Sequence, residues 1–195
     1  NFCSKSEYEK YGKRANRYAD EIAGLTSVLT ERVKNSRAEF VVHSRQAYGV
    51  VPLWVLSNDL TFGNLEHFFN LMKPAERNEF CKVVSKSTGR LGDKALGFFK
   101  PEKAQTCLET LVKFRNICAH DERLYCARVG GRKSINYAKM VWMLERFLTA
   151  SEFNSFLNEF IDLSNEGLAQ ENAVAHILRV AGFSEITDEI RRRLK

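Results

Sequence analysis

Apolar residues recur at intervals of three and four along most of this chain, and that spacing restricts what it can fold into. Between residues 101 and 120, apolar side chains stand at Leu108, Leu111, Val112 and Phe114. A period near 3.6 residues is typical of a helix with one buried face, whereas a half-buried strand alternates every second residue. The spacing therefore predicts one amphipathic helix over 101–120.

The same spacing predicts helices elsewhere. The predicted ranges are 8–33, 136–148, 153–163, 173–180 and 186–194. We expect Ser151 to cap the third of these helices. Pro52, Pro74 and Pro101 each stand where a helix can begin, because its first turn does not need the N–H that proline lacks. No pair of segments has strand alternation, so the sequence predicts an all-α fold.

A chain of 195 residues, of which 44% are hydrophobic, is long enough for one sizeable core. We therefore expect a single helical domain over 1–195. Within it, 1–50 form N-terminal helices and 51–165 form the central part. Residues 166–195 form either a small helical appendage or part of the same bundle.

Charge and hydropathy limit the setting of the protein. The formal net charge of +6 permits a polyanionic partner, but many ordinary proteins share such an excess. No apolar run reaches the roughly 18 to 20 residues needed to cross a bilayer, and no leader is recognisable, so we expect a cytoplasmic protein without membrane contact. The chain begins at Asn1 and not at Met, which we interpret as a processed or truncated N-terminus.

Five cysteines with no paired spacing are typical of a reducing compartment. Cys107, Cys118, His120 and Cys126 lie within twenty residues, but they lack the C-x2-C and H-x3-H spacings of a zinc site, so we expect no metal. Cys118 is expected to be a small buried apolar residue. No glycine-rich phosphate loop is present either, and we expect no cofactor.

The end of the predicted 101–120 helix combines chemically capable residues. Arg115, Asn116 and His120 stand there among small or apolar neighbours. Histidine exchanges a proton near neutral pH, and arginine offers a fixed charge with a fork of donors that suits a phosphate. These residues suit phosphoryl chemistry on RNA, with His120 as general base or acid and Arg115 stabilising charge on the phosphate oxygens. A structural alternative is a helix C-terminus in which cations favour the dipole and Asn116 caps locally.

Helix geometry constrains that catalytic interpretation. Arg115 and His120 differ by about 140° around a regular helix and by about 7.5 Å along its axis. Asn116 shares a face with His120, and Arg123 follows on the same side as a candidate RNA contact. We therefore expect Arg115 to reach His120 through its long side chain, through a distorted helix end, or across the two-fold axis of a homodimer.

Two segments carry a resemblance to a known family. Residues 115–124 read Arg-Asn-Ile-Cys-Ala-His-Asp-Glu-Arg-Leu, and residues 52–63 read Pro-Leu-Trp-Val-Leu-Ser-Asn-Asp-Leu-Thr-Phe-Gly. The first resembles the motif of Abi-like (abortive infection) proteins, an arm of the HEPN superfamily with its Arg-x4-6-His pattern. The second resembles the Pro-x-Trp and Ser-Phe-Gly helix pair of the same family. One departure is Asn58, since family members usually carry an acidic residue four positions after the tryptophan.

The resemblance implies a HEPN-like helical bundle with additional C-terminal helices that dimerises to form a composite cleft. It implies a metal-independent endoribonuclease that cleaves RNA by 2′-hydroxyl attack, in abortive infection or as the toxin of a toxin–antitoxin pair. Arg115, Asn116 and His120 carry over as catalytic residues. RNA is the implied substrate, and an antitoxin protein or a small RNA is an expected partner. The alternative is a non-catalytic module that binds nucleic acid or protein.

Other candidate residues have simpler interpretations. Arg132 and Lys133, beside two glycines, are the loop residues we expect to contact RNA. Aromatic residues at helical spacing are expected in the core. They are Trp54, Phe62, Phe68, Phe69, Phe98 and Phe99. His43, His67 and His176 have no convergent partners in the sequence and are expected to be ordinary surface or core histidines.

Overall fold

The computed structural model describes residues 2–120, 122–130, 134–170 and 172–183. These residues are mostly helical and contain no strand, which confirms the all-α prediction. Val129 and Ile135 form an isolated antiparallel bridge. The chain divides into two compact units, Asn1–Asn78 and Glu79–Lys195. A single domain over 1–195 stays a prediction.

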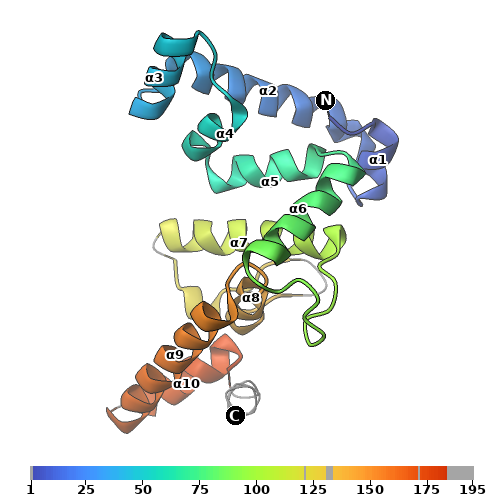
Figure 1. The fold of residues 1–195 in the computed structure, drawn as a ribbon. Coiled ribbons are helices and arrows are strands. Elements are labelled where there is room, and N and C mark those ends of the chain that lie inside the picture. Colours follow the sequence, from blue (N-terminus) through green and yellow to red (C-terminus); the bar gives the residue numbers. More distant parts are fainter. Residues whose placement is uncertain (1, 121, 131–133, 171, 184–195) are drawn as a thin grey trace. The chain divides into compact units, whose positions relative to one another are not determined.

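Unit 1 consists of helices separated by tight turns. In chain order they are α1 (Lys5–Lys10), η1 (Ala15–Arg17), α2 (Tyr18–Asn35), α3 (Glu39–Tyr48), α4 (Leu53–Leu56), η2 (Ser57–Asp59) and α5 (Phe62–Leu71). A further helix, α6 (Pro74–Ser87), begins in unit 1 and contains the boundary between the units. Within unit 1, α2 and α5 lie side by side (Figure 1).

The single helix predicted over 8–33 is wrong, because the chain turns at Gly12. That glycine has a φ of 76°, a conformation that L side chains rarely adopt. Tyr8 and Tyr18 therefore stand on different elements, with ring centroids 5.5 Å apart. The Tyr18 hydroxyl donates to the Cys3 carbonyl at 2.5 Å, and these residues pack around the buried Leu71. Tyr8 and Tyr18 are thus spaced as if on one helix, although they belong to two elements that pack onto the same core.

A buried arginine completes this core. Arg77, in the first turn of α6, is 1% exposed, and its guanidinium carbon lies 3.7 Å from the Tyr11 ring centroid and 4.7 Å from that of Phe69. Cation–π contacts of this kind gain strength when the cation is removed from water. The arginine therefore ties the start of α6 to α5 and to the turn that follows α1.

Unit 2 contains the helices that follow α6. They are α7 (Pro101–Ala119), η3 (Leu124–Cys126), α8 (Tyr137–Leu144), α9 (Ala150–Gln170) and α10 (Asn172–Ala181). Pro74 and Pro101 begin helices as predicted, whereas Pro52 stands one residue before α4. The helices α9 and α10 pack against each other (Figure 1). The helix predicted over 186–194 lies outside the described residues.

Two predicted helix ends differ from the structure. The helix predicted over 136–148 ends earlier, at Leu144. The cap of α9 is Thr149 and not Ser151: the Glu152 carboxylate accepts from the Thr149 amide at 2.8 Å, and the Glu152 amide donates to the Thr149 hydroxyl at 3.2 Å. This reciprocal capping box satisfies two amides at once, which a cap at Ser151 would not do.

Two of the aromatic residues expected in the core are on the surface. Trp54 is 74% exposed and Phe98 is 58% exposed, whereas Phe69 and Phe99 are buried. Helical spacing does not reveal whether a neighbouring element covers a given face, and no described neighbour covers these two rings. None of the described helices is long and apolar enough to span a bilayer.

Aromatic contacts assemble the core of unit 2. Phe114 of α7 lies 6.4 Å from Tyr137 of α8, measured between ring centroids. Tyr137 lies 5.6 Å from Phe183, which in turn lies 4.4 Å from Phe160 of α9. Aromatic pairs at these separations add stability beyond the area they bury. This continuous row of rings connects α7 with the C-terminal helices.

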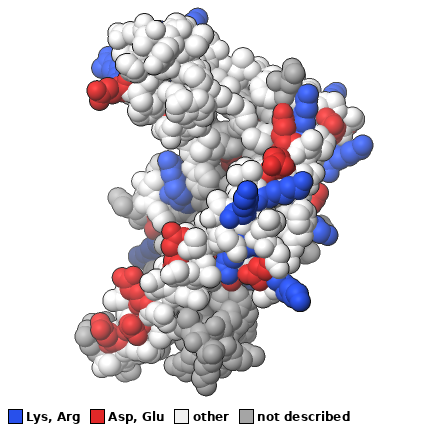
Figure 2. Space-filling model, in the orientation of Figure 1, with Lys and Arg blue, Asp and Glu red and all other residues white. Residues whose placement is uncertain are grey.

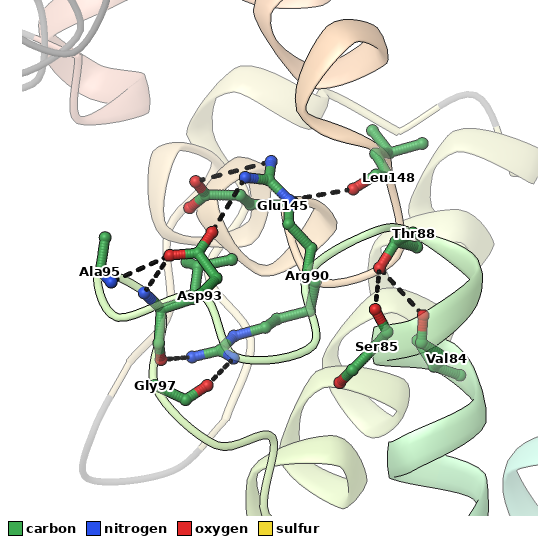
Figure 3. Close-up of polar contacts among 11 residues, drawn as sticks. Val84, Ser85, Thr88, Arg90, Asp93, Ala95, Gly97, Glu145 and Leu148 are labelled. Carbon is green, nitrogen blue, oxygen red and sulfur yellow. Dashed lines mark hydrogen bonds and ion pairs between the residues drawn. The ribbon is translucent and has the colours of Figure 1, made fainter.

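Two arginines hold the loop between α6 and α7, and Figure 3 shows the contacts of one of them, Arg90. Arg90 pairs with Asp93 at 3.3 Å and with Glu145 at 4.0 Å. Arg146, 5% exposed, donates to the carbonyl oxygens of Leu96 and Gly97. Both guanidiniums therefore join the loop to the segment between α8 and α9.

We predict that Arg146→Met destabilises the protein by about 1 to 3 kcal/mol, because it removes the donors to the two loop carbonyls. Arg146→Lys should recover part of this loss, since a lysine keeps the charge but lacks the planar fork. Urea unfolding measures the change. Arg179→Met on α10 is the matched control, because Arg179 is exposed. Equal stability of Arg146→Met and the wild type would contradict this assignment.

Asp93 predicts a pH dependence of stability. The Leu96 and Ala95 amides and the Arg90 guanidinium hold the pKa of Asp93 below its ordinary value of 3.8. The folded chain then binds fewer protons than the unfolded chain, so this contribution is present above pH 3.8 and is lost as the pH falls through the lowered pKa.

We therefore predict that Asp93→Asn, which keeps the acceptor oxygen but loses the charge, is less stable than the wild type at neutral pH. The difference between the two unfolding free energies should shrink as the pH falls below 3.8, as urea titrations at several pH values would show. Asp162→Asn on the exposed side of α9 is the control. A difference that stays constant with pH would refute the prediction.

Candidate functional site

The Arg-Asn-x-x-x-His segment forms the last turn of α7. This helix begins with Pro101 in its first turn and buries Cys107, Leu111 and Phe114 along one face. Every residue after Phe114 is exposed or half-buried, because the helix continues past the elements that cover its apolar face. The motif therefore lies on a projecting helix end.

Arg115 and Asn116 contact each other directly. Nη1 of Arg115 donates to Oδ1 of Asn116 at 3.0 Å, and both residues are exposed. The contact turns the arginine side chain toward the helix face that Asn116 shares with His120. The backbone positions of Arg115 and His120 differ by about 140° around the helix axis. The long arginine side chain bends toward His120 and so reduces the angle between the two functional groups.

His120 is the C-cap of α7 and leaves the helix, with φ −105° and ψ 18°. Its amide is shared between the carbonyls of Asn116 at 3.1 Å and Ile117 at 3.3 Å, and the Glu122 amide also donates to Ile117, at 3.1 Å. These bonds satisfy carbonyls that a helix end leaves open. The imidazole is exposed, and within the described part of the chain it has no hydrogen-bond partner.

Arg123 lies between this helix end and η3 and is also exposed. Its carbonyl accepts a hydrogen bond from the Cys126 thiol at 3.4 Å, which fixes the backbone of the turn. Among the described residues, neither Arg115 nor Arg123 forms an ion pair. Both guanidiniums are therefore available to an anion. Arg132 and Lys133 lie outside the described residues.

The described surface of α9 carries the opposite charge. Acidic side chains gather over α9 (Figure 2). They are Glu152, Glu159, Asp162 and Glu166. The described side chains of α9 include neither Lys nor Arg. This charge repels a polyanion from α9.

The cysteines near the motif differ in burial. Cys107 is buried, and that burial raises the pKa of its thiol. Cys118 is exposed, so the expectation that it is buried is wrong: it follows Phe114 by four residues, at a point where the helix has lost its cover. Among the described residues, no group of three or more His, Cys, Asp or Glu side chains could hold a metal ion.

The upstream segment 52–63 forms α4, η2 and the start of α5. Thr61 caps α5 through a reciprocal bond with Asn64. Asn58, at the position where the resemblance leads us to expect an acidic residue, donates to the Trp54 carbonyl at 3.0 Å. The adjacent Asp59 pairs with Arg32 of α2 at 3.8 Å.

An apolar groove of about 510 Å³ lies along this helix pair. Its lining consists of Leu53, Trp54, Ser57, Leu60, Leu65, Phe68 and Met72. The exposed Trp54 thus forms one wall of the groove.

The structure corrects the expectation that His67 has no partners. Nδ1 of His67 lies 2.7 Å from the Glu21 carboxylate, and Nε2 lies 4.0 Å from that of Glu66. The buried Glu66 also accepts from Asn70 and lies 3.9 Å from Lys13. The i, i+4 spacing of Glu66 and Asn70 was visible in the sequence, but Glu21 stands 46 residues before His67 and only folding brings it near.

The family model described as "Abi-like protein" matches residues 1–126. The chain belongs to this family. The matched range contains both the 52–63 segment and the motif at the end of α7, whereas α8, α9 and α10 lie beyond it. Family membership puts the protein in the context of abortive infection, a phage-defence response. No curated protein and no solved structure matched the chain.

Proposed function

We propose that this Abi-like protein is a metal-independent endoribonuclease of the HEPN superfamily, acting in abortive infection or as the toxin of a toxin–antitoxin pair. One observation carries the proposal. At the end of α7, the bonded Arg115–Asn116 pair and the His120 imidazole are exposed on one surface, and no described carboxylate neutralises the guanidinium.

These groups match the chemistry of RNA cleavage. A 2′-hydroxyl attacks the adjacent phosphorus as a histidine removes its proton, and the 5′-oxygen leaves as it gains one. The products are a 2′,3′-cyclic phosphate and a 5′-hydroxyl. Arg115 stabilises the negative charge on the non-bridging phosphate oxygens, and Asn116 holds its guanidinium in place. Arg123, Arg132 and Lys133 bind neighbouring phosphates.

The exposure of the motif favours a homodimer. One imidazole on an open helix end does not easily serve as base on one side of the phosphorus and as acid on the other. A two-fold axis near the end of α7 brings a second His120 and a second Arg115 to the same phosphate. An antitoxin protein or a small RNA then inhibits this nuclease.

We predict that the purified protein cleaves mixed RNA in the presence of EDTA. Arg115→Ala and His120→Ala should each lower the cleavage rate by at least about 100-fold, because each removes a group that acts on the transition state. End-group analysis of the products identifies the cyclic phosphate. His176→Ala, an exposed histidine on α10, is the matched control.

Thermal unfolding should show that all three variants remain folded. Full-rate cleavage by both motif variants would rule out these residues as the catalytic groups. Loss of cleavage in EDTA, restored by a divalent cation, would rule out the metal-independent mechanism.

We predict that the cleavage rate of mixtures of wild-type and His120→Ala chains is proportional to the square of the wild-type fraction, once subunits have exchanged. This follows if one phosphate needs the imidazoles of both protomers. Cleavage rates across a series of mixing ratios measure the dependence, and light scattering confirms the dimer. A linear dependence would show that each chain carries a complete site.

The second candidate is a non-catalytic module that binds nucleic acid or protein. It is favoured by the open placement of the motif within one chain and by Asn58 in place of an acidic residue. In that case RNA binding persists without cleavage, and His120→Ala changes the affinity alone.

A further inference from the structure

Lys113 is an exposed cation on the same helix as the candidate site. It precedes Asn116 by three residues and His120 by seven, so all three lie on one face of α7. The rise of a helix puts Lys113 about 4.5 Å from Asn116 and about 10.5 Å from His120 along the axis. A lysine side chain at that position reaches toward a phosphate adjacent to the one bound by Arg115.

The Lys113 ammonium has no partner among the described residues. Glu109, four residues before it on the same face, is already engaged: Nε2 of Gln105 donates to its carboxylate at 2.9 Å. The charge of Lys113 is therefore available for an anion from outside the chain.

Glu109 also limits where a polyanion can bind. Its negative charge stands one turn before Lys113 and disfavours a phosphate at that turn. In the other direction, Arg123 follows the helix end, and the bond to Asn116 at 3.0 Å turns the Arg115 side chain toward the same face. The cations thus flank His120 over the last two turns of α7 and the turn that follows.

We propose that Lys113 is a positioning residue that binds the phosphate next to the scissile one, so that RNA runs along the last two turns of α7. The inference rests on the proposed function for its substrate class. An ammonium on a flexible stem recognises charge and not base identity. Lys113 therefore contributes to affinity for RNA of any sequence and leaves the chemical step unchanged.

The test uses a labelled single-stranded oligonucleotide whose 2′-hydroxyls are methylated, so that it binds but cannot be cleaved. Fluorescence anisotropy gives Kd for the wild type and for Lys113→Ala between about 50 and 200 mM salt. We expect Lys113→Ala to weaken binding by about 3- to 10-fold, and to reduce the slope of log K against log salt by about 0.7, the loss of one phosphate contact.

Two matched variants sharpen the measurement. Lys113→Arg keeps the charge and should retain the wild-type slope. Lys103→Ala, an exposed lysine near the start of α7 beyond Glu109, should leave binding unchanged. With unmodified RNA, Lys113→Ala should raise KM while kcat stays near that of the wild type, which a role in catalysis or folding would not produce.

The outcomes separate this inference from the proposed function. An unchanged salt slope in a folded Lys113→Ala variant overturns the inference, whether or not the wild type cleaves RNA. Lys113-dependent binding by a wild type that cleaves no RNA supports the inference and overturns the nuclease. A wild type that binds no RNA overturns both.

Discussion

The contact between Phe114 and Tyr137 determines how the candidate site is presented. It joins α7 to α8, and the row of rings continues from Tyr137 through Phe183 to Phe160. Because Phe114 is buried and the next residue is not, α7 leaves the core at Arg115. Burial of the Phe114 ring thus anchors α7 in the core and leaves the final turn of this helix free to contact another molecule.

The arginines of unit 2 have two distinct roles, although the sequence presents them alike. The guanidiniums of the buried Arg146 and the half-buried Arg90 bond to carbonyls and carboxylates of the loop and of the segment after α8, so their donors are used within the fold. Those of Arg115 and Arg123 are exposed and form no ion pair with a described residue. A guanidinium removed from water must be satisfied internally, whereas an exposed one can bind a ligand. The net charge of the chain therefore indicates less about its binding partners than the burial of each charged side chain does.

Much of the candidate site was predictable, because its members are close in the sequence. Arg115, Asn116 and His120 occupy one short segment, and helix geometry alone put Asn116 and His120 on one face. The structure added the bond between Arg115 and Asn116, which depends on a side-chain rotamer and not on spacing. The partners of His67 could not be predicted, because Glu21 comes from another helix. The exposure of Cys118 could not be predicted either, because the apolar spacing of α7 continues past the point where other elements cover the helix.

The sequence by itself determined the helical class, the starts at Pro74 and Pro101, and a motif at a helix end, because periodicity, proline chemistry and capping act over a few residues. The tertiary structure decided that the chain turns at Gly12, where two apolar stripes fold onto one core. It also decided that Trp54 is exposed while Arg146 is buried. Burial depends on which distant segment covers a surface, and a local pattern contains no information about that cover.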